Sequence, residues 1–257
     1  EAKFESLWPA SVQVVGKDIL RFHAVIWPAM LMAAGLKPAD QVFGHGWLLV
    51  GGEKMSKSKL TGIAPSQITD TFGSDAFRYY FMKAIAFGSD GSFSWEDLSA
   101  RYQSELANGL GNLASRVLAM IKRYFDGVVP APAGYNEVDL AIQAVAEKAI
   151  ATADAAIDEI AIHDAIGSVW TLVDELNNYI TVSEPWVLAK DEANRDRLAS
   201  VLYTTAEGLR VLSVALAPVM PKATAKLWAA LTEGKLGELA DQPLSEAGNW
   251  GQLLPGI

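Results

Sequence analysis

The sequence contains no cysteine, which excludes disulfide bonds and thiolate metal ligands in this chain of 257 residues. Its only three histidines, at positions 23, 45 and 163, are too few and too scattered to suggest a zinc cluster. No apolar run is long enough to span a membrane, because the strongest, residues 211–220, is short and interrupted by Pro218. We therefore expect a cytoplasmic protein with no metal site and no membrane partner.

Positive charge is also scarce, since 21 lysine and arginine residues face 30 acidic residues and the formal net charge is −9. Diffuse binding to nucleic acid is disfavoured, because affinity for a phosphate backbone depends on cations that neutralise it. Any contact with RNA must therefore be local. One small basic block lies at residues 116–123, and another lies at residues 54–59.

The block at residues 54–59 follows an apolar run, residues 42–50, and a pair of glycines. This order predicts a strand that ends in a tight turn, since glycine adopts positive φ without strain. The loop beyond the turn carries three lysines with hydroxyl side chains between them, a set suited to a polyanion such as a triphosphate. A solvated basic hairpin fits the same composition. The spacing differs from that of a Walker A loop, which excludes that class of phosphate site.

Residues 54–58 read Lys-Met-Ser-Lys-Ser and resemble, without substitution, the signature of class I aminoacyl-tRNA synthetases. With four further segments, the sequence resembles methionyl-tRNA synthetases over nearly its whole length. Nothing in it resembles the family's other signature, His-Ile-Gly-His, which belongs to the amino-terminal half. The family commonly continues from the first signature into Gly-Asn, where this chain has Lys59-Leu60, so the path of the loop exit stays open. The four segments are Gly16-Lys17-Asp18, Phe22-His23, Trp27-Pro28-Ala29 and Asn112-Leu113-Ala114-Ser115-Arg116.

The resemblance implies an α/β remnant of a Rossmann-type catalytic domain at residues 1–50. It further implies a stem-contact region with the signature loop at residues 51–98 and an all-α anticodon-binding helix bundle at residues 99–257. The enzyme would activate methionine with ATP and Mg²⁺ and transfer it to tRNA(Met), and this chain would be its carboxyl-terminal half. We expect the chain to be inactive without the amino-terminal half. A non-catalytic tRNA-binding module and an acidic helical scaffold are the alternatives.

The signature loop is expected to stabilise phosphate rather than to act as an acid or base. Attack of an amino-acid carboxylate on the α-phosphate of ATP builds negative charge on oxygens, which ammonium groups can meet. Lys57 is the first candidate for a catalytic residue and Lys54 is the second. Ser56 and Ser58 are candidates for ATP binding.

The segment Gly16-Lys17-Asp18 follows a β-type run, residues 12–15, and precedes an apolar-periodic segment. This order predicts a strand, a turn and a helix, and open α/β sheets bind ligands at such turns. Gly16 would allow close backbone approach and Lys17 would contact phosphate. Asp18 would accept hydrogen bonds from ribose hydroxyls, or it would only cap the helix. The resemblance favours ATP contact by all three residues.

Two histidines and a tryptophan are further candidates for ligand contact. His23 and Trp27 are four residues apart and share a helix face, where ordinary core packing is the alternative. The resemblance places both in the methionine pocket, and a thioether packs favourably on aromatic rings. His45 lies between two glycines on the predicted strand 42–50, where it would contact adenine or be an ordinary edge histidine.

Apolar stripes at helical spacing predict long helices at residues 137–160, 164–182 and 194–217, which would pack as an antiparallel bundle. Trp170 lies within one of these stripes and should be buried. The segment from Thr232 onward is rich in glycine, proline and acids, and it predicts a loose tail without chemistry.

Five residues of the helical part are candidates for tRNA recognition. Asn108, Asn112 and Arg116 step by four along one face and supply both donors and acceptors, as the recognition of exposed base edges requires. A hydrated helix surface is the alternative. Pro185 ends a helix, and Trp186 beside it would stack on an unpaired base or plug the helix end. The resemblance assigns the row to the anticodon helix and Pro185-Trp186 to contact with the CAU anticodon.

Overall fold

The computed structural model describes residues 2–55 and 62–257. The candidates Ser56, Lys57 and Ser58 lie outside the described residues. The chain forms two compact units: unit 1 comprises residues 1–63 and 84–94, and unit 2 comprises residues 64–83 and 95–257. The division into three parts near residues 50 and 98 stays a prediction.

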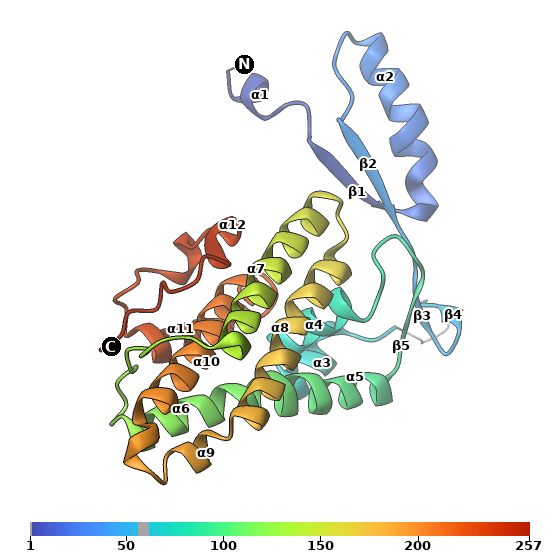
Figure 1. Ribbon diagram of the computed structural model, residues 1–257. Coiled ribbons are helices and arrows are strands. Elements are labelled where there is room, and N and C mark those ends of the chain that lie inside the picture. The colour runs from blue at the N-terminus through green and yellow to red at the C-terminus, as the bar shows by residue number, and fades with distance from the viewer. Residues whose placement is uncertain (1, 56–61) are drawn as a thin grey trace. The chain divides into compact units, whose positions relative to one another are not determined.

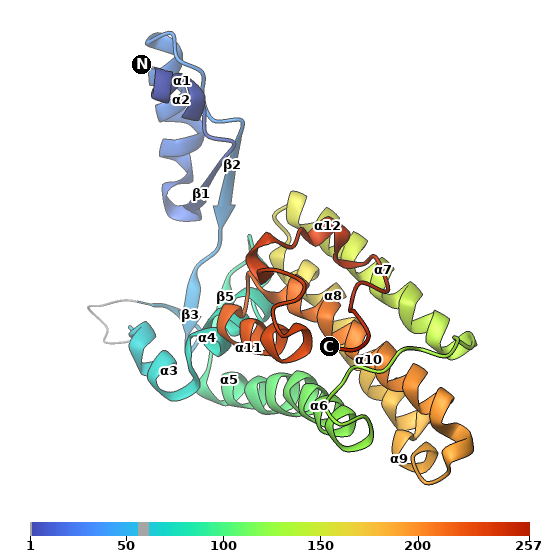
Figure 2. The ribbon, with the colours of Figure 1, turned by 90° about the vertical axis from the view of Figure 1, so that its left-hand side faces the viewer.

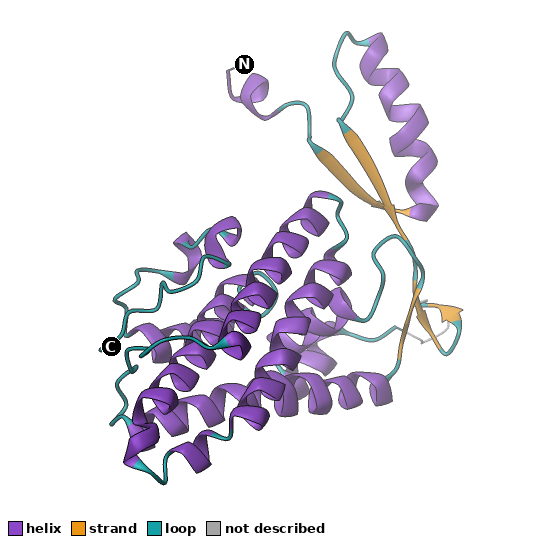
Figure 3. Cartoon of the chain, viewed as in Figure 1, coloured by secondary structure: helices purple, strands orange, loops and turns teal. Residues whose placement is uncertain are grey.

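Unit 1 contains two small sheets and short helices (Figures 1 and 3). Its described elements are α1 (Ala2–Leu7), β1 (Val12–Gly16), the 3₁₀ turn η1 (Lys17–Ile19), the π-helical turn η2 (Phe22–Ile26), α2 (Trp27–Ala33), β2 (Gln41–His45), β3 (Leu48–Val50), β4 (Glu53–Lys54) and β5 (Gly91–Phe93).

The strand, turn and helix predicted at the start of the chain are confirmed. β1 and β2 are parallel, with Val12 opposite Gln41 and Gly16 opposite His45, and the helical segment between them is the crossover. Parallel strands require such a connection, which is the βαβ unit of Rossmann-type folds. The carboxyl ends of both strands therefore meet, and they bring Gly16 beside His45.

The single strand predicted at residues 42–50 is wrong, because the run is split between two sheets. β2 pairs with β1, whereas β3 pairs antiparallel with β4 and parallel with β5. The break falls at Gly46, where a Cβ atom would lie 2.1 Å from the carbonyl oxygen of Ser89. The backbone here passes so close to the loop before β5 that no side chain fits. The predicted turn is confirmed, since Gly51 and Gly52 have φ values of 62° and 81°.

Unit 2 is helical throughout, and all of its residues are described (Figure 3). Both ribbon views show α7, α8 and α10 side by side as the centre of the bundle (Figures 1 and 2). Its elements are α3 (Pro65–Phe72), α4 (Ser74–Lys83), α5 (Trp95–Arg101), the π-helix η3 (Tyr102–Gly111), α6 (Asn112–Tyr124), α7 (Glu137–Asp158), α8 (Ile162–Ser183), α9 (Pro185–Leu188), η4 (Glu192–Asn194), α10 (Arg195–Leu216), α11 (Pro221–Thr232), η5 (Leu239–Asp241) and α12 (Leu244–Ala247).

The predicted bundle is confirmed, and its apolar stripes form one continuous core. Trp170 is buried, as its position in a stripe predicted, and its ring lies 4.7 Å from that of Tyr79. α7 begins at a side-chain cap, because the Asn136 carboxamide oxygen accepts hydrogen bonds from the backbone N–H groups of Val138 and Asp139. α8 ends at Ser183, directly before Glu184 in the left-handed conformation and Pro185.

A buried polar network ties the start of α7 to α8 and α10. The Asp139 side chain is fully buried; it accepts a hydrogen bond from the Tyr179 hydroxyl and pairs with Arg197 at 2.5 Å. Burial alone would raise the pKa of Asp139, but hydrogen bonds from Arg197, Tyr179 and the Asn136 backbone N–H outweigh it and hold that pKa below its ordinary value.

The expectation of a loose tail is corrected by a buried ion pair on α10. Glu207 and Arg210 pair at 2.9 Å with side chains 0% and 1% exposed. The Glu207 carboxylate accepts hydrogen bonds from the backbone N–H groups of three consecutive tail residues, 251–253. Arg210 donates to the carbonyl oxygens of Ala247 and Asn249. The tail is therefore fixed by charge-assisted hydrogen bonds as well as by packing.

Candidate functional site

Two sequence candidates of unit 1, Lys17 and Lys54, contact a residue that sequence reasoning missed, Trp47, between β2 and β3. The Nζ atom of Lys17 lies 4.1 Å from the centroid of the Trp47 ring, and the Nζ atom of Lys54 lies 4.4 Å from it. Both distances are those of cation–π contacts. Two lysines 37 positions apart in the sequence thus contact the same aromatic ring.

Each of these lysines also has a carboxylate partner. Lys54 Nζ lies 3.3 Å from Asp18 Oδ2, and Lys17 Nζ lies 2.6 Å from Oδ1 of Asp90, a second residue that sequence reasoning missed. The hydrogen bond from Lys54 lowers the pKa of Asp18, and the hydrogen bonds from Lys17 and the Trp47 backbone N–H lower the pKa of Asp90. Both carboxylates of the cluster are therefore held in the ionised form beside the lysine side chains.

Gly16 and His45 lie at the carboxyl ends of the paired strands, beside this cluster. A Cβ atom at Gly16 would lie 2.7 Å from Asp18 Oδ1, so the turn brings this carboxylate against the strand end. His45 is half-buried, its ring stacks on Phe87 at 6.0 Å, and its Nδ1 donates to the carbonyl oxygen of Gly46 at 2.9 Å. Its orientation is thus determined from two sides.

The two candidates for the methionine pocket are in contact. The rings of His23 and Trp27 meet edge to face, with centroids 5.8 Å apart, and both side chains are half-buried. His23 Nδ1 donates to the carbonyl oxygen of Ile19 at 3.1 Å. Trp8, which sequence reasoning missed, lies 6.1 Å from the ring of Trp27. The π-helical turn η2 spans this segment, and such turns are frequent at functional sites.

Two candidates of unit 2, Arg116 on α6 and Trp186 on α9, are in contact. The Arg116 guanidinium lies 5.8 Å from the centroid of the Trp186 ring, so two candidates 70 positions apart are neighbours. The Trp186 side chain is 38% exposed, whereas Pro185 is buried. Asn108 and Asn112 are exposed, and Gln103 donates to the Asn108 side chain at 3.3 Å. Trp186 is therefore accessible for stacking, and Pro185 serves to begin α9.

The helix that carries these residues is π-helical through Gly111 and α-helical from Asn112. Cβ atoms at Gly109 and Gly111 would lie 3.4 and 3.0 Å from the carbonyl oxygens five residues before them. The glycines thus accommodate the wider turn without breaking the helix. In the row of candidates, Asn108 therefore lies in the π-helical segment, whereas Asn112 and Arg116 lie in the α-helical segment.

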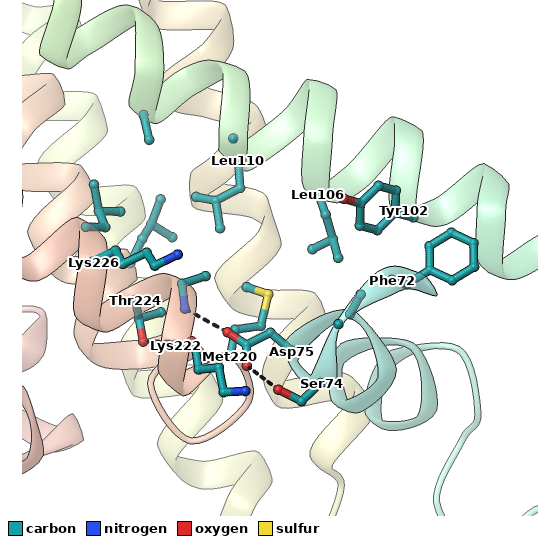
Figure 4. A pocket seen from close by; sticks show the side chains of 17 residues that line it. Phe72, Ser74, Asp75, Tyr102, Leu106, Leu110, Met220, Lys222, Thr224 and Lys226 are labelled. Atoms are coloured by element: carbon teal, nitrogen blue, oxygen red, sulfur yellow. Dashed lines mark hydrogen bonds between the residues drawn. The ribbon is translucent and has the colours of Figure 1, made fainter. Parts of the chain in front are cut away.

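Unit 2 also has a cavity of about 490 Å³ between α3, α4, η3, α6, α10 and α11 (Figure 4). Asp75 lies at its edge, where it accepts a hydrogen bond from the backbone N–H of Ala223 at 2.7 Å and so caps the start of α11. Lys222 and Lys226 line the same cavity. None of the predicted site residues is among its lining residues.

No group of three histidine, aspartate or glutamate side chains suited to holding a metal ion is found within residues 2–55 and 62–257. In the same part of the chain, none of the helices has both the length and the apolar character needed to span a bilayer.

Comparison with known proteins assigns most of the chain. Residues 1–118 match the family described as tRNA synthetases class I (M), and residues 139–251 match the anticodon-binding domain of tRNA ligase. Methionine–tRNA ligase of Streptomyces coelicolor is 55% identical over 99% of this chain. The chain belongs to the methionyl-tRNA synthetase family. The fold predicted from the sequence, a Rossmann-type remnant followed by a helical anticodon-binding part, is that of the family.

Other methionyl-tRNA synthetases agree with this assignment. The methionine–tRNA ligase of Caldanaerobacter subterraneus subsp. tengcongensis is 46% identical over 89% of the chain. The Mycobacterium tuberculosis methionyl-tRNA synthetase in complex with methionyl-adenylate superposes over 100% of the chain with a TM-score of 0.92 and 37% identity. The chain spans 48% of the Streptomyces protein, 36% of the Caldanaerobacter protein and 50% of the Mycobacterium chain.

Proposed function

We propose that the chain is the carboxyl-terminal half of a methionine–tRNA ligase. The whole enzyme activates methionine with ATP, which enters as its Mg²⁺ complex, and then transfers the methionyl group to tRNA(Met). This chain supplies the signature loop, part of the methionine pocket and the recognition of the anticodon. The cytoplasmic location expected from the sequence stays a prediction.

The observation that supports this proposal most is the contact of Lys17 and Lys54 with one ring, with Asp18 paired to Lys54, near the carboxyl ends of β1 and β2. Open α/β sheets bind ligands at these ends, and ammonium groups there stabilise phosphate oxygens. In this proposal Gly16, Lys17, Asp18 and His45 bind ATP.

The roles of the signature loop rest on its sequence. Lys57 stabilises the transition state together with Lys54, because negative charge grows on the phosphoryl oxygens as pyrophosphate departs. Ser56 and Ser58 donate hydrogen bonds to ATP.

The methionine pocket is proposed at the edge-to-face pair of His23 and Trp27. Their half-buried rings, with Trp8 behind Trp27, offer aromatic edges to a thioether.

Recognition of tRNA is proposed at the Arg116–Trp186 contact. The exposed indole offers a face on which an unpaired base can stack, the guanidinium beside it supplies charge, and Asn108 and Asn112 supply amide donors and acceptors. Pro185 fixes the place of the indole at the start of α9.

A further protein part is proposed to cover the exposed apolar side chains of unit 1. Val14 on β1 is 52% exposed, and Val25, Met30 and Met32 on the crossover helix are 61%, 65% and 69% exposed. Exposed apolar groups of this number mark an interaction surface. The amino-terminal half of the synthetase, which would extend the sheet beyond β1, is the occupant we propose, and the chain without it is expected to be inactive.

Methionine-dependent exchange of pyrophosphate into ATP tests the proposal. The complete synthetase should catalyse this exchange with methionine and not with leucine, and the chain alone should not catalyse it. Binding of tRNA by the chain without any exchange in the complete protein would favour a non-catalytic tRNA-binding module instead.

A further inference from the structure

The position of Trp47 is determined by a loop that lies more than 40 residues later in the sequence. Its backbone N–H donates to Asp90 Oδ1 at 2.8 Å, and its carbonyl oxygen accepts from the backbone N–H of Gly91 at 2.9 Å. The tight approach of Gly46 to Ser89 holds the same two segments together. The loop at residues 89–91 therefore fixes the backbone from which the Trp47 ring projects.

The Trp47 ring contacts two like charges. The Nζ atoms of Lys17 and Lys54, at 4.1 and 4.4 Å from one centroid, would repel each other without an opposing charge. The π-electrons of the indole attract both ammonium groups, and the carboxylates of Asp90 and Asp18 balance their charges. The arrangement is a pair of cations prepared for a larger anion.

The two lysines are held with different strength. Lys17 lies 2.6 Å from Asp90, which also binds the Trp47 backbone, so this lysine, its carboxylate and the ring form one fixed group. Lys54 lies 3.3 Å from Asp18, and both side chains are about half exposed. Exposed ion pairs of this kind contribute little to stability, so Lys54 can exchange its carboxylate for a phosphate oxygen at low cost.

We propose that Trp47 and Asp90 are positioning residues of the ATP site. The Trp47 ring holds the ammonium groups of Lys17 and Lys54 for contact with a nucleotide's polyphosphate, and Asp90 fixes the Trp47 backbone and Lys17. This inference rests on the proposed function, because it adds two residues to that ATP site. Neither residue is expected to touch methionine.

Three variants of the complete synthetase test the inference. Trp47→Leu keeps an apolar side chain but removes the electron-rich π-system of the ring. We expect kcat/KM for ATP in pyrophosphate exchange to fall about 5- to 30-fold, as for the loss of two cation–π contacts. Trp47→Phe keeps a weaker ring face and should lie between Leu and wild type. Asp90→Asn keeps an oxygen that accepts from the Trp47 N–H but removes the negative charge opposite Lys17, so kcat/KM for ATP should also fall. Asp40→Asn, a surface acid of the same unit, is the control.

Comparison of the kinetic constants for ATP with those for methionine separates a positioning role from a structural role. The KM for ATP should rise in the Trp47 and Asp90 variants while the KM for methionine stays unchanged, whereas a general loss of folded protein would lower the apparent kcat and leave both KM values unchanged. Equal kcat/KM for ATP in wild type, Trp47→Leu and Asp90→Asn would overturn the inference. A wild-type enzyme without any exchange would refute the proposed function itself, so the two failures are distinguishable.

A spectroscopic signature tests the geometry in this chain without any activity. After reductive ¹³C-methylation of lysines, the Lys17 and Lys54 resonances should be shifted upfield by the ring current of Trp47. Both shifts should disappear in Trp47→Leu and be unchanged in Asp40→Asn. Resonances at ordinary lysine positions in wild type would overturn the inference even if Trp47→Leu failed to fold.

Discussion

Replacement of Glu207 by glutamine should destabilise unit 2 far more than the change of one atom group suggests. The Glu207 carboxylate is 0% exposed, pairs with Arg210 at 2.9 Å, and accepts three backbone N–H groups of the tail within 3.1 Å. A glutamine amide has one acceptor oxygen, and its NH₂ group would face donors that the second carboxylate oxygen now satisfies. Arg210 would be left as a buried charge without its partner.

The magnitude follows from this geometry. Removal of one member of a buried ion pair costs about 3–5 kcal/mol, because the remaining charge stays buried and uncompensated. For a unit of this size each kcal/mol lowers the melting temperature by about 2–4 °C, so we expect a decrease of about 6–20 °C. Urea unfolding followed by circular dichroism at 222 nm measures the free energy directly.

A matched control exists at the start of α10. Glu192 and Arg195 form an ion pair with the same spacing of three residues, at 3.6 Å, but with side chains 85% and 47% exposed. Glu192→Gln should leave the unfolding free energy nearly unchanged, as is usual for exposed pairs.

Hydrogen exchange provides a second and local measurement. The amides of residues 251–253 should be protected in wild type and exchange much faster in Glu207→Gln. A loss of less than about 1 kcal/mol in Glu207→Gln, or unprotected tail amides in wild type, would refute the anchoring of the tail by the buried pair.

Three further predictions concern tRNA, ATP and pH. Trp186→Ala should weaken binding of methionine tRNA by about 1–3 kcal/mol in filter binding, the range for loss of one stacked base, and should spare methionine-dependent exchange; equal loss of both would indicate a structural role. Lys57→Ala in the complete synthetase should lower pyrophosphate exchange by about a hundredfold to a thousandfold with methionine affinity unchanged, and unchanged exchange would reject its catalytic role. The pKa of Asp139 is lowered in the folded state, so the stability it contributes is present above roughly pH 4 and is lost as pH falls through its folded pKa. Urea titrations between about pH 5 and pH 2 should therefore show a shallower loss of stability in Asp139→Asn than in wild type, and parallel curves would contradict this.

The helical bundle was predictable because its signals are local. Residues such as Trp170, Leu176 and Leu202 recur at helical spacing, and burial of such a stripe decides where a helix packs. The end of α8 was predictable for the same reason, because proline at position 185 cannot continue a helix beyond its first turn.

The break in the predicted strand at residues 42–50 was not predictable, because its cause is distant in the sequence. The run is apolar and β-type on both sides of Gly46, and only the approach of Ser89 forces the chain into a second sheet. The same loop brings Asp90 to Lys17, and no spacing rule links residues 73 positions apart. Trp47 was therefore absent from the predicted site although the side chains of Lys17 and Lys54 both contact its ring.

The sequence contains a signal for the buried ion pair on α10, namely two opposite charges within a helix segment that is otherwise suited to burial. Glu207 and Arg210 stand in a stretch in which every residue from Leu198 to Val214 is buried. Charges in such a stretch are almost never buried unless they are paired, so a partner three residues away predicts a buried ion pair. That the pair holds the tail depends on backbone groups, which the sequence does not reveal.

The central claim, that this chain recognises methionine tRNA by its anticodon, is tested most directly by equilibrium binding of the chain to two transcripts that differ only in the anticodon. The transcript with CAU should bind at least about tenfold more tightly than the one with an altered anticodon, because base stacking and base-edge contacts depend on that loop. This difference should persist when the salt concentration is raised, although both affinities fall. Equal affinity for the two transcripts at every salt concentration would contradict the account.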